Sequence, residues 1–169
     1  MGISAESVQL AVDLEKEGYE YYREHAEKTD NSLTETVLNS LASRELEHIE
    51  VVNQIAEGKS VSSASLEKVD IEGQIKDVFQ DFSAKEREGW KKEEEEVYEH
   101  GLELEQKLYD LYEDLKADAE NPDQRDFFDA LMKEENKHYE SLQNVIYYLT
   151  DHDRWMAEEE GKVWGWMNV

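Results

Sequence analysis

Two glutamate/histidine sets with the same internal spacing occur in the two halves of this 169-residue chain. Each set has one Glu that is followed, after the same interval, by a Glu-x-x-His pair. Every residue of the second set lies 90 positions after its counterpart in the first, and the six residues are Glu15, Glu45, His48, Glu105, Glu135 and His138. Of the five histidines, only His48 and His138 have a Glu three residues before them. The repeat indicates a two-metal site, and any fold must bring all six residues together.

The length and composition indicate one soluble domain over residues 1–169, long enough to bury a core. Cysteine is absent, which excludes disulfides, iron-sulfur clusters and thiolate zinc sites. There is no apolar run of the roughly 20 residues that a membrane span needs, and the N-terminus lacks a signal-peptide pattern. A cytoplasmic location is therefore expected. The net charge of −25 argues against nucleic acid as a partner and favours cations.

Four long segments carry the helical period, at about 7–28, 32–57, 97–119 and 122–150. Their ends have recognisable signals. Asp30, Asn31 and Ser32 are candidates to cap the second segment and Gly58 to end it, while Asn121 with Pro122 suits the start of the fourth. An all-α fold is expected.

Short connections join the first two segments and the last two, which predicts two antiparallel hairpins. The stretch 58–96 is too long for a turn, and its apolar residues between Ile71 and Phe82 predict a short helix within a crossover. Two hairpins joined by one long crossover have the connectivity of ferritin-like four-helix bundles. The bundle is expected to span about 7–150, and residues 151–169 form a Trp-rich tail that we expect to dock on the bundle or a dimer partner.

The six repeated residues fall on the inward faces of these predicted helices, in steps of three and four with apolar neighbours. Four buried carboxylates would repel one another and are costly to bury without positive partners. Two divalent cations would balance the four negative charges, and His48 and His138 would each add a neutral nitrogen. Oxygen-rich ligation with one imidazole per metal suits iron first, or manganese or a mixed Fe/Mn pair.

Two tyrosines repeat with the metal pattern. Tyr22 and Tyr112 each lie seven residues after the first Glu of their set, on the same helical face. They are candidates to hydrogen-bond a ligand carboxylate, in addition to packing as core aromatics.

Over about residues 8–150, the chain resembles the rubrerythrin branch of the ferritin-like di-iron carboxylate proteins. The resemblance is carried by the segments AVDLEKEGYEYY and GLELEQKLYDLY and by the pairs within RELEH and EENKH. It implies that Glu15 and Glu105 are terminal ligands, that Glu45 and Glu135 bridge the metals, and that His48 and His138 each bind one iron.

Two departures from the family pattern are present. The cysteine-containing rubredoxin-like domain of full-length members is missing from this sequence, so electrons would come from an external donor such as a rubredoxin. The extra Glu that family members carry three residues after the third-helix ligand is replaced by Leu108. The remaining six-ligand set resembles a bacterioferritin ferroxidase centre equally well.

The function expected from this resemblance is a di-iron enzyme that reduces hydrogen peroxide or dioxygen. An iron-storage subunit of bacterioferritin type is the first alternative; no haem is expected, because Leu46 stands where such a subunit has its haem-binding Met. The second alternative is a non-catalytic helical interaction module, which binds no metal. A homodimer is expected, because ferritin-like bundles commonly dimerise.

Overall fold

The computed structural model describes residues 3–59 and 92–151. Every regular element among them is an α-helix, which confirms the all-α prediction. The helices are α1 (Ala5–Lys28), α2 (Ser32–Ala56), α5 (Lys92–Asp118) and α6 (Pro122–Thr150). No helix in these described ranges is long and apolar enough to cross a membrane.

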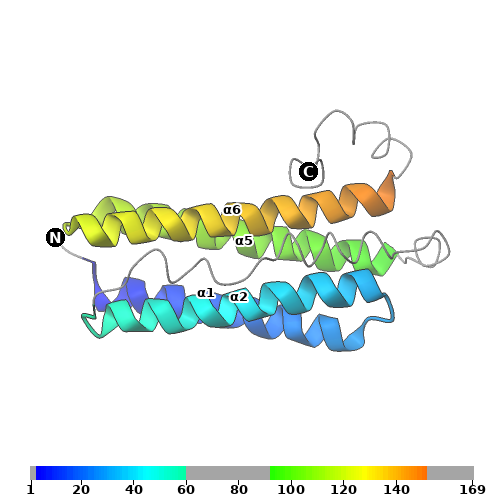
Figure 1. Cartoon of the computed structure of the whole chain (residues 1–169), viewed down its shortest axis with the longest axis horizontal. Coiled ribbons are helices and arrows are strands. Elements are labelled where there is room, and N and C mark those ends of the chain that lie inside the picture. Colours follow the sequence, from blue (N-terminus) through cyan, green and yellow to red (C-terminus); the bar gives the residue numbers. More distant parts are fainter. Residues whose placement is uncertain (1–2, 60–91, 152–169) are drawn as a thin grey trace.

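The four helices form a bundle of two antiparallel hairpins (Figure 1). Helices α1 and α2 form one hairpin, and α5 and α6 form the other. Helix α2 ends and α5 begins at opposite ends of the bundle, so these two helices run parallel. This arrangement confirms the ferritin-like topology predicted from the long connection between the hairpins.

The helix ends follow local sequence signals. The side chain of Asn31 accepts hydrogen bonds from two backbone N–H groups in the first turn of α2, and Asn121 caps α6 in the same way before Pro122. Gly58 follows α2 with a φ of 72°, a left-handed conformation that glycine adopts without steric cost. Its N–H and that of Lys59 bond to carbonyls of the last turn of α2. The predictions at Asn31, Gly58, Asn121 and Pro122 are confirmed.

The predicted start of the third long helix was wrong by about one turn. Helix α5 begins at Lys92 rather than near residue 97, so the crossover predicted over 58–96 is shorter at its end. Glu93, Glu94 and Glu95 lie in the first turn, where negative side chains interact favourably with the helix dipole. The helix predicted near 71–82 and the tail after 151 lie outside the described residues.

Two apolar clusters fill the bundle, one toward each end. The first includes Tyr22, Leu38, Tyr98 and Leu142. The second includes Val12, Leu108, Phe128 and Leu131, and Tyr112 belongs to it. Each cluster draws on all four helices, which explains why each helix has an apolar stripe over most of its length. The buried Glu and His residues of the repeat lie between the two clusters, at the middle of the bundle.

Candidate metal centre

All six residues of the repeated pattern meet in the core. Helix α1 contributes Glu15 and α5 contributes Glu105, while α2 and α6 each contribute a Glu-x-x-His pair. All six are at most 2% exposed. They converge because positions three and four apart lie on one helix face, and because each hairpin turns that face toward the other.

The two imidazoles lie side by side with carboxylates around them. Their rings are nearly parallel, at 10°, with centroids 5.5 Å apart. Nδ1 of His48 lies 3.4 Å from Oε1 of Glu15, and Nδ1 of His138 lies 3.2 Å from Oε2 of Glu105. Each histidine therefore has the first Glu of its own hairpin as a neighbour.

Glu45 and Glu135 lie between these two Glu/His pairs. One oxygen of Glu135 is 2.9 Å from Nδ1 of His48, and its other oxygen is 3.4 Å from Nδ1 of His138. Glu45 reaches across to His138, with Oε1 at 3.1 Å from Nδ1. Both carboxylates thus touch both halves of the site, which is the arrangement that the family resemblance implied for bridging ligands.

The donor atoms are close enough together to hold metal ions. Glu15, Glu45 and His48 offer donor atoms that all lie within 4.8 Å of one another, and Glu45, Glu105, Glu135 and His138 do the same. Glu45 belongs to both groups. The geometry therefore supports two adjacent metal positions that share a carboxylate.

Hydrogen bonding leaves many of these buried atoms without partners. Although some of these atoms lie 2.9 to 3.4 Å apart, both carboxylate oxygens of Glu45 and of Glu135, both ring nitrogens of His48 and Nε2 of His138 form no hydrogen bond of acceptable geometry within the protein. Buried polar atoms are ordinarily satisfied, and an unpaired one is destabilising. Carboxylate oxygens with imidazole nitrogens are also a donor set that suits iron or manganese. The residues present thus fit a pair of divalent cations.

The electrostatics of the metal-free site lead to the same conclusion. Burial, and then the charges of Glu15 and Glu135, raise the pKa of Glu45 well above its usual value. Burial and the charge of Glu45 likewise raise the pKa of Glu105. Burial works against charge on His48, but the nearby Glu15 and Glu135 outweigh it and raise the imidazole pKa. Without cations, protons have to compensate the carboxylates.

Tyr22 and Tyr112 cross between the hairpins to reach carboxylates of the opposite one. The hydroxyl of Tyr22 on α1 donates to Oε1 of Glu105 on α5, and the hydroxyl of Tyr112 on α5 donates to Oε1 of Glu15 on α1. Burial is the main cause of the raised pKa of both phenols, so they remain protonated donors. Each tyrosine thereby orients the carboxylate that the opposite helix, α5 or α1, contributes to the site.

Gly18 leaves room for one of the shared carboxylates. A Cβ at this position would lie 3.2 Å from Oε2 of Glu45, which is tighter than ordinary contact. A glycine inside a helix costs about 1 kcal/mol relative to alanine, so this position sacrifices helix stability for space beside Glu45.

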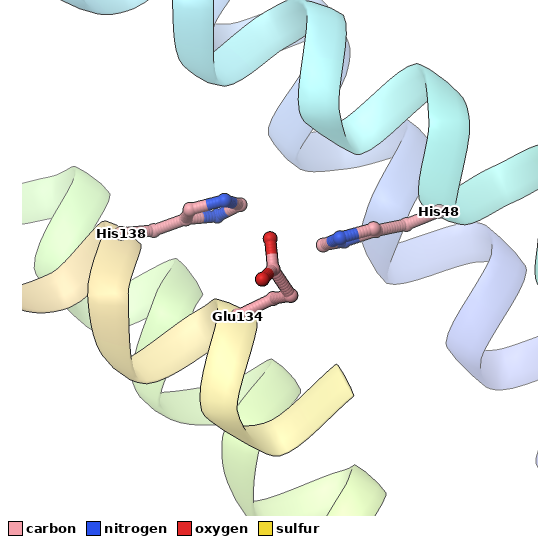
Figure 2. A group of neighbouring side chains, drawn as sticks. All are labelled: His48, Glu134 and His138. Carbon is pink, nitrogen blue, oxygen red and sulfur yellow. The ribbon is translucent and has the colours of Figure 1, made fainter. Parts of the chain in front are cut away.

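Two charged residues next to the site were missed by the sequence analysis. Glu134 lies in front of the two imidazoles in Figure 2, with its carboxylate between them, and one of its oxygens is within 4.8 Å of a nitrogen of each. Arg44 donates to Glu134 through one nitrogen and to Glu47 through another, at 2.7 Å. The side chain of Arg44 is only 1% exposed. A signal was present, because Arg44 and Glu134 are 90 residues apart and thus occupy equivalent positions of the repeat.

A four-helix bundle with one inward Glu on each of two helices and a Glu-x-x-His pair on each of the other two defines the ferritin-like di-metal carboxylate class. Within that class, the family model described as rubrerythrin matches residues 6–146. The chain therefore belongs to the rubrerythrin family, whose members carry a di-iron carboxylate site. Comparisons with curated proteins and with solved structures gave no significant match.

Proposed function

We propose that this protein is a di-iron oxidoreductase that reduces hydrogen peroxide, or dioxygen, with electrons from an external donor such as a rubredoxin. The observation that carries the proposal is the position of Glu45 and Glu135 between two Glu/His pairs, in a core that also supplies two tyrosine donors. Glu15 and His48 would hold one iron and Glu105 and His138 the other. When bound, such an iron pair would supply the two electrons needed to convert peroxide and two protons into two water molecules.

The protein residues hold this site in place and limit its contact with bulk water. The apolar clusters above and below the site shield it along the bundle axis. The four carboxylates offset the charge of two divalent cations. Tyr22 and Tyr112 hold Glu105 and Glu15 by hydrogen bonds, which limits the rotation of these side chains when the charge at the site changes.

An anaerobic titration with Fe(II), followed by rapid mixing with peroxide or with dioxygen, tests this proposal. We expect two equivalents of iron to bind and to be oxidised faster by peroxide, and a rubredoxin to restore the reduced form. Binding of fewer than two equivalents would contradict the site, and would favour a helical interaction module. Faster oxidation by dioxygen would contradict the preference for peroxide.

A ferroxidase or iron-storage subunit is the second candidate, and Leu108 favours it. This residue stands where the family resemblance implies an additional Glu, and it is buried at 1% exposure in the apolar cluster that contains Tyr112. The site thus has six ligating residues and no seventh carboxylate from this position. A storage subunit assembles into a large shell, whereas we expect a homodimer, so the mass of the protein in solution distinguishes the two.

A further inference from the structure

A pocket of about 130 Å³ lies between α5 and α6 and extends from the surface to the metal-binding carboxylates. Its lining combines buried and exposed residues: Glu105, Gln106, Tyr109, Glu135, Asn136 and Tyr139. Glu105 and Glu135 are buried, Tyr109 and Tyr139 are half-buried, and Gln106 and Asn136 are exposed. The pocket is therefore large enough to admit water-sized groups.

The lining offers oxygen atoms and no basic side chain. Nε2 of Gln106 donates to Asp110 at 2.8 Å, and Nδ2 of Asn136 donates to Glu140 at 3.1 Å. These bonds engage the amide nitrogens and leave the amide oxygens as acceptors at the pocket rim. Carbonyl, phenol and carboxylate oxygens are groups to which a hydrated divalent cation or its water molecules bind well.

The equivalent surface of the first hairpin has different chemistry. Counting back 90 positions from the rim residues gives Lys16, Tyr19, Leu46 and Ile49. These residues have the same degrees of exposure as their counterparts, and Leu46 is 51% exposed. An ammonium group and two apolar side chains thus replace the two amides and a tyrosine. A cation is repelled by Lys16 and finds fewer oxygen atoms there.

We propose that divalent metal ions reach the buried centre through the pocket between α5 and α6, and that Gln106 and Asn136 hold the hydrated ion at its rim. This inference rests on the metal site of the proposed function. The rim acts on the rate of transfer, because its residues are separate from the six that hold the bound metal. An uncharged substitution at the rim therefore alters metal uptake and metal release by the same factor and leaves the affinity unchanged.

Stopped-flow uptake of Co(II) by the chelator-treated full chain, followed by visible absorbance, tests the route. Asn136→Trp fills the rim with a large side chain on an exposed helix position, and Leu46→Trp makes the matched change on the first hairpin. We expect Asn136→Trp to slow uptake and chelator-induced release at least tenfold with unchanged stoichiometry, and Leu46→Trp to stay within twofold of the original protein. Circular dichroism verifies that both variants remain helical.

A second pair of variants tests the charge argument without adding bulk. Gln106→Lys places at the rim the residue type found at position 16, whereas Gln143→Lys adds the same charge at an exposed position of α6 outside the pocket. We expect only Gln106→Lys to slow uptake several-fold, with the difference shrinking at high salt because exposed charges are screened. Equal rates in Asn136→Trp and Leu46→Trp, or slower uptake only in the latter, would overturn the route. If the original protein takes up no Co(II), the proposed metal site itself is wrong.

Discussion

The two hairpins present the same candidate metal-binding residues but different neighbours. Glu15, Glu45 and His48 of the first hairpin recur in the second without a change of residue type. Immediately beside them, Arg44 corresponds to Glu134, and Glu47 corresponds to Lys137. The charge of the neighbour is therefore reversed at both pairs of equivalent positions.

This difference shows how a repeated pattern avoids self-repulsion. Equivalent positions of two facing hairpins lie near each other, so equal charges there would destabilise the bundle. The reversed charges pair instead. Arg44 bonds to Glu134 across the hairpins, and Lys137 lies 3.3 Å from the same carboxylate. The ligands can repeat because cations are expected between them, while their neighbours have to complement each other directly.

Tyr22 and Tyr112 differ from these charged neighbours, because both the residue type and its role are the same in the two hairpins. Each hydroxyl donates to a carboxylate of the opposite hairpin, so one hydrogen bond runs from α1 to α5 and the other from α5 to α1. The two tyrosines can therefore repeat without repulsion, because each hydroxyl contacts a carboxylate and not the other tyrosine.

The largest expected effect follows from removing the shared carboxylates. Glu45→Ala and Glu135→Ala should each abolish binding of the metal pair, because both residues contact both halves of the site. The helices should remain, and the metal-free variants should gain stability because a buried charge is removed. Metal analysis measures the bound metal, and circular dichroism during unfolding measures helix content and stability. Retention of two metals by the double variant would disprove the assignment of these residues.

The next effect concerns the reversed charges. Arg44→Met removes the ion pairs to Glu134 and Glu47, and Lys137 is then the remaining ion-pair partner of Glu134 among the described residues. We expect the free energy of unfolding to fall by about 3 kcal/mol, which is the lower end for a broken buried pair because the two acids are partly exposed. Urea unfolding of the chelated protein measures this loss. Lys137→Met is the control at the exposed pair, where a loss of under about 1 kcal/mol is expected. Equal losses in the two variants would contradict the role given to Arg44.

The tyrosines allow a direct test of the equivalence of the two halves. Tyr22→Phe and Tyr112→Phe each remove one hydroxyl donor from a ligand carboxylate, and we expect each to weaken metal binding about tenfold. Calorimetric titration with Co(II) measures the affinities. Tyr22 should act on the half that contains Glu105, and Tyr112 on the half that contains Glu15. A large effect from only one variant would show that the halves are not equivalent.

The smallest effects are expected at two helical glycines that the repeat does not share. Gly18→Ala and Gly101→Ala should each change the stability of the chelated protein by less than about 1 kcal/mol, because better helix propensity offsets crowding. A Cβ at Gly101 meets a side-chain carbon of Leu142 at 3.1 Å and the ring and hydroxyl of Tyr22 at 3.2 and 3.3 Å, whereas at Gly18 it meets an oxygen of Glu45 itself. Gly18→Ala should therefore lower metal affinity more than Gly101→Ala, because it crowds Glu45 directly, whereas Gly101→Ala acts on the site only through Tyr22. A comparable loss in Gly101→Ala would contradict this distinction.

Local sequence signals predicted most of the fold. Asn31, Gly58 and Asn121 mark helix ends through bonds to their own backbone, which do not depend on the rest of the molecule. The start of α5 was misplaced because the run of Glu residues has no apolar period, although it is helical in the structure. The long connection between the hairpins was enough to predict the topology.

The sequence alone determined which six residues form the candidate centre, because the helical period places them on inward faces and the repeat distinguishes them from the other acids. Only the tertiary structure decided which carboxylate of the opposite hairpin each tyrosine contacts, and that Arg44 is buried against Glu134. The reason is physical. A helical period specifies the direction of a side chain relative to its own helix, whereas the rotation and spacing of facing helices depend on how all their side chains pack together.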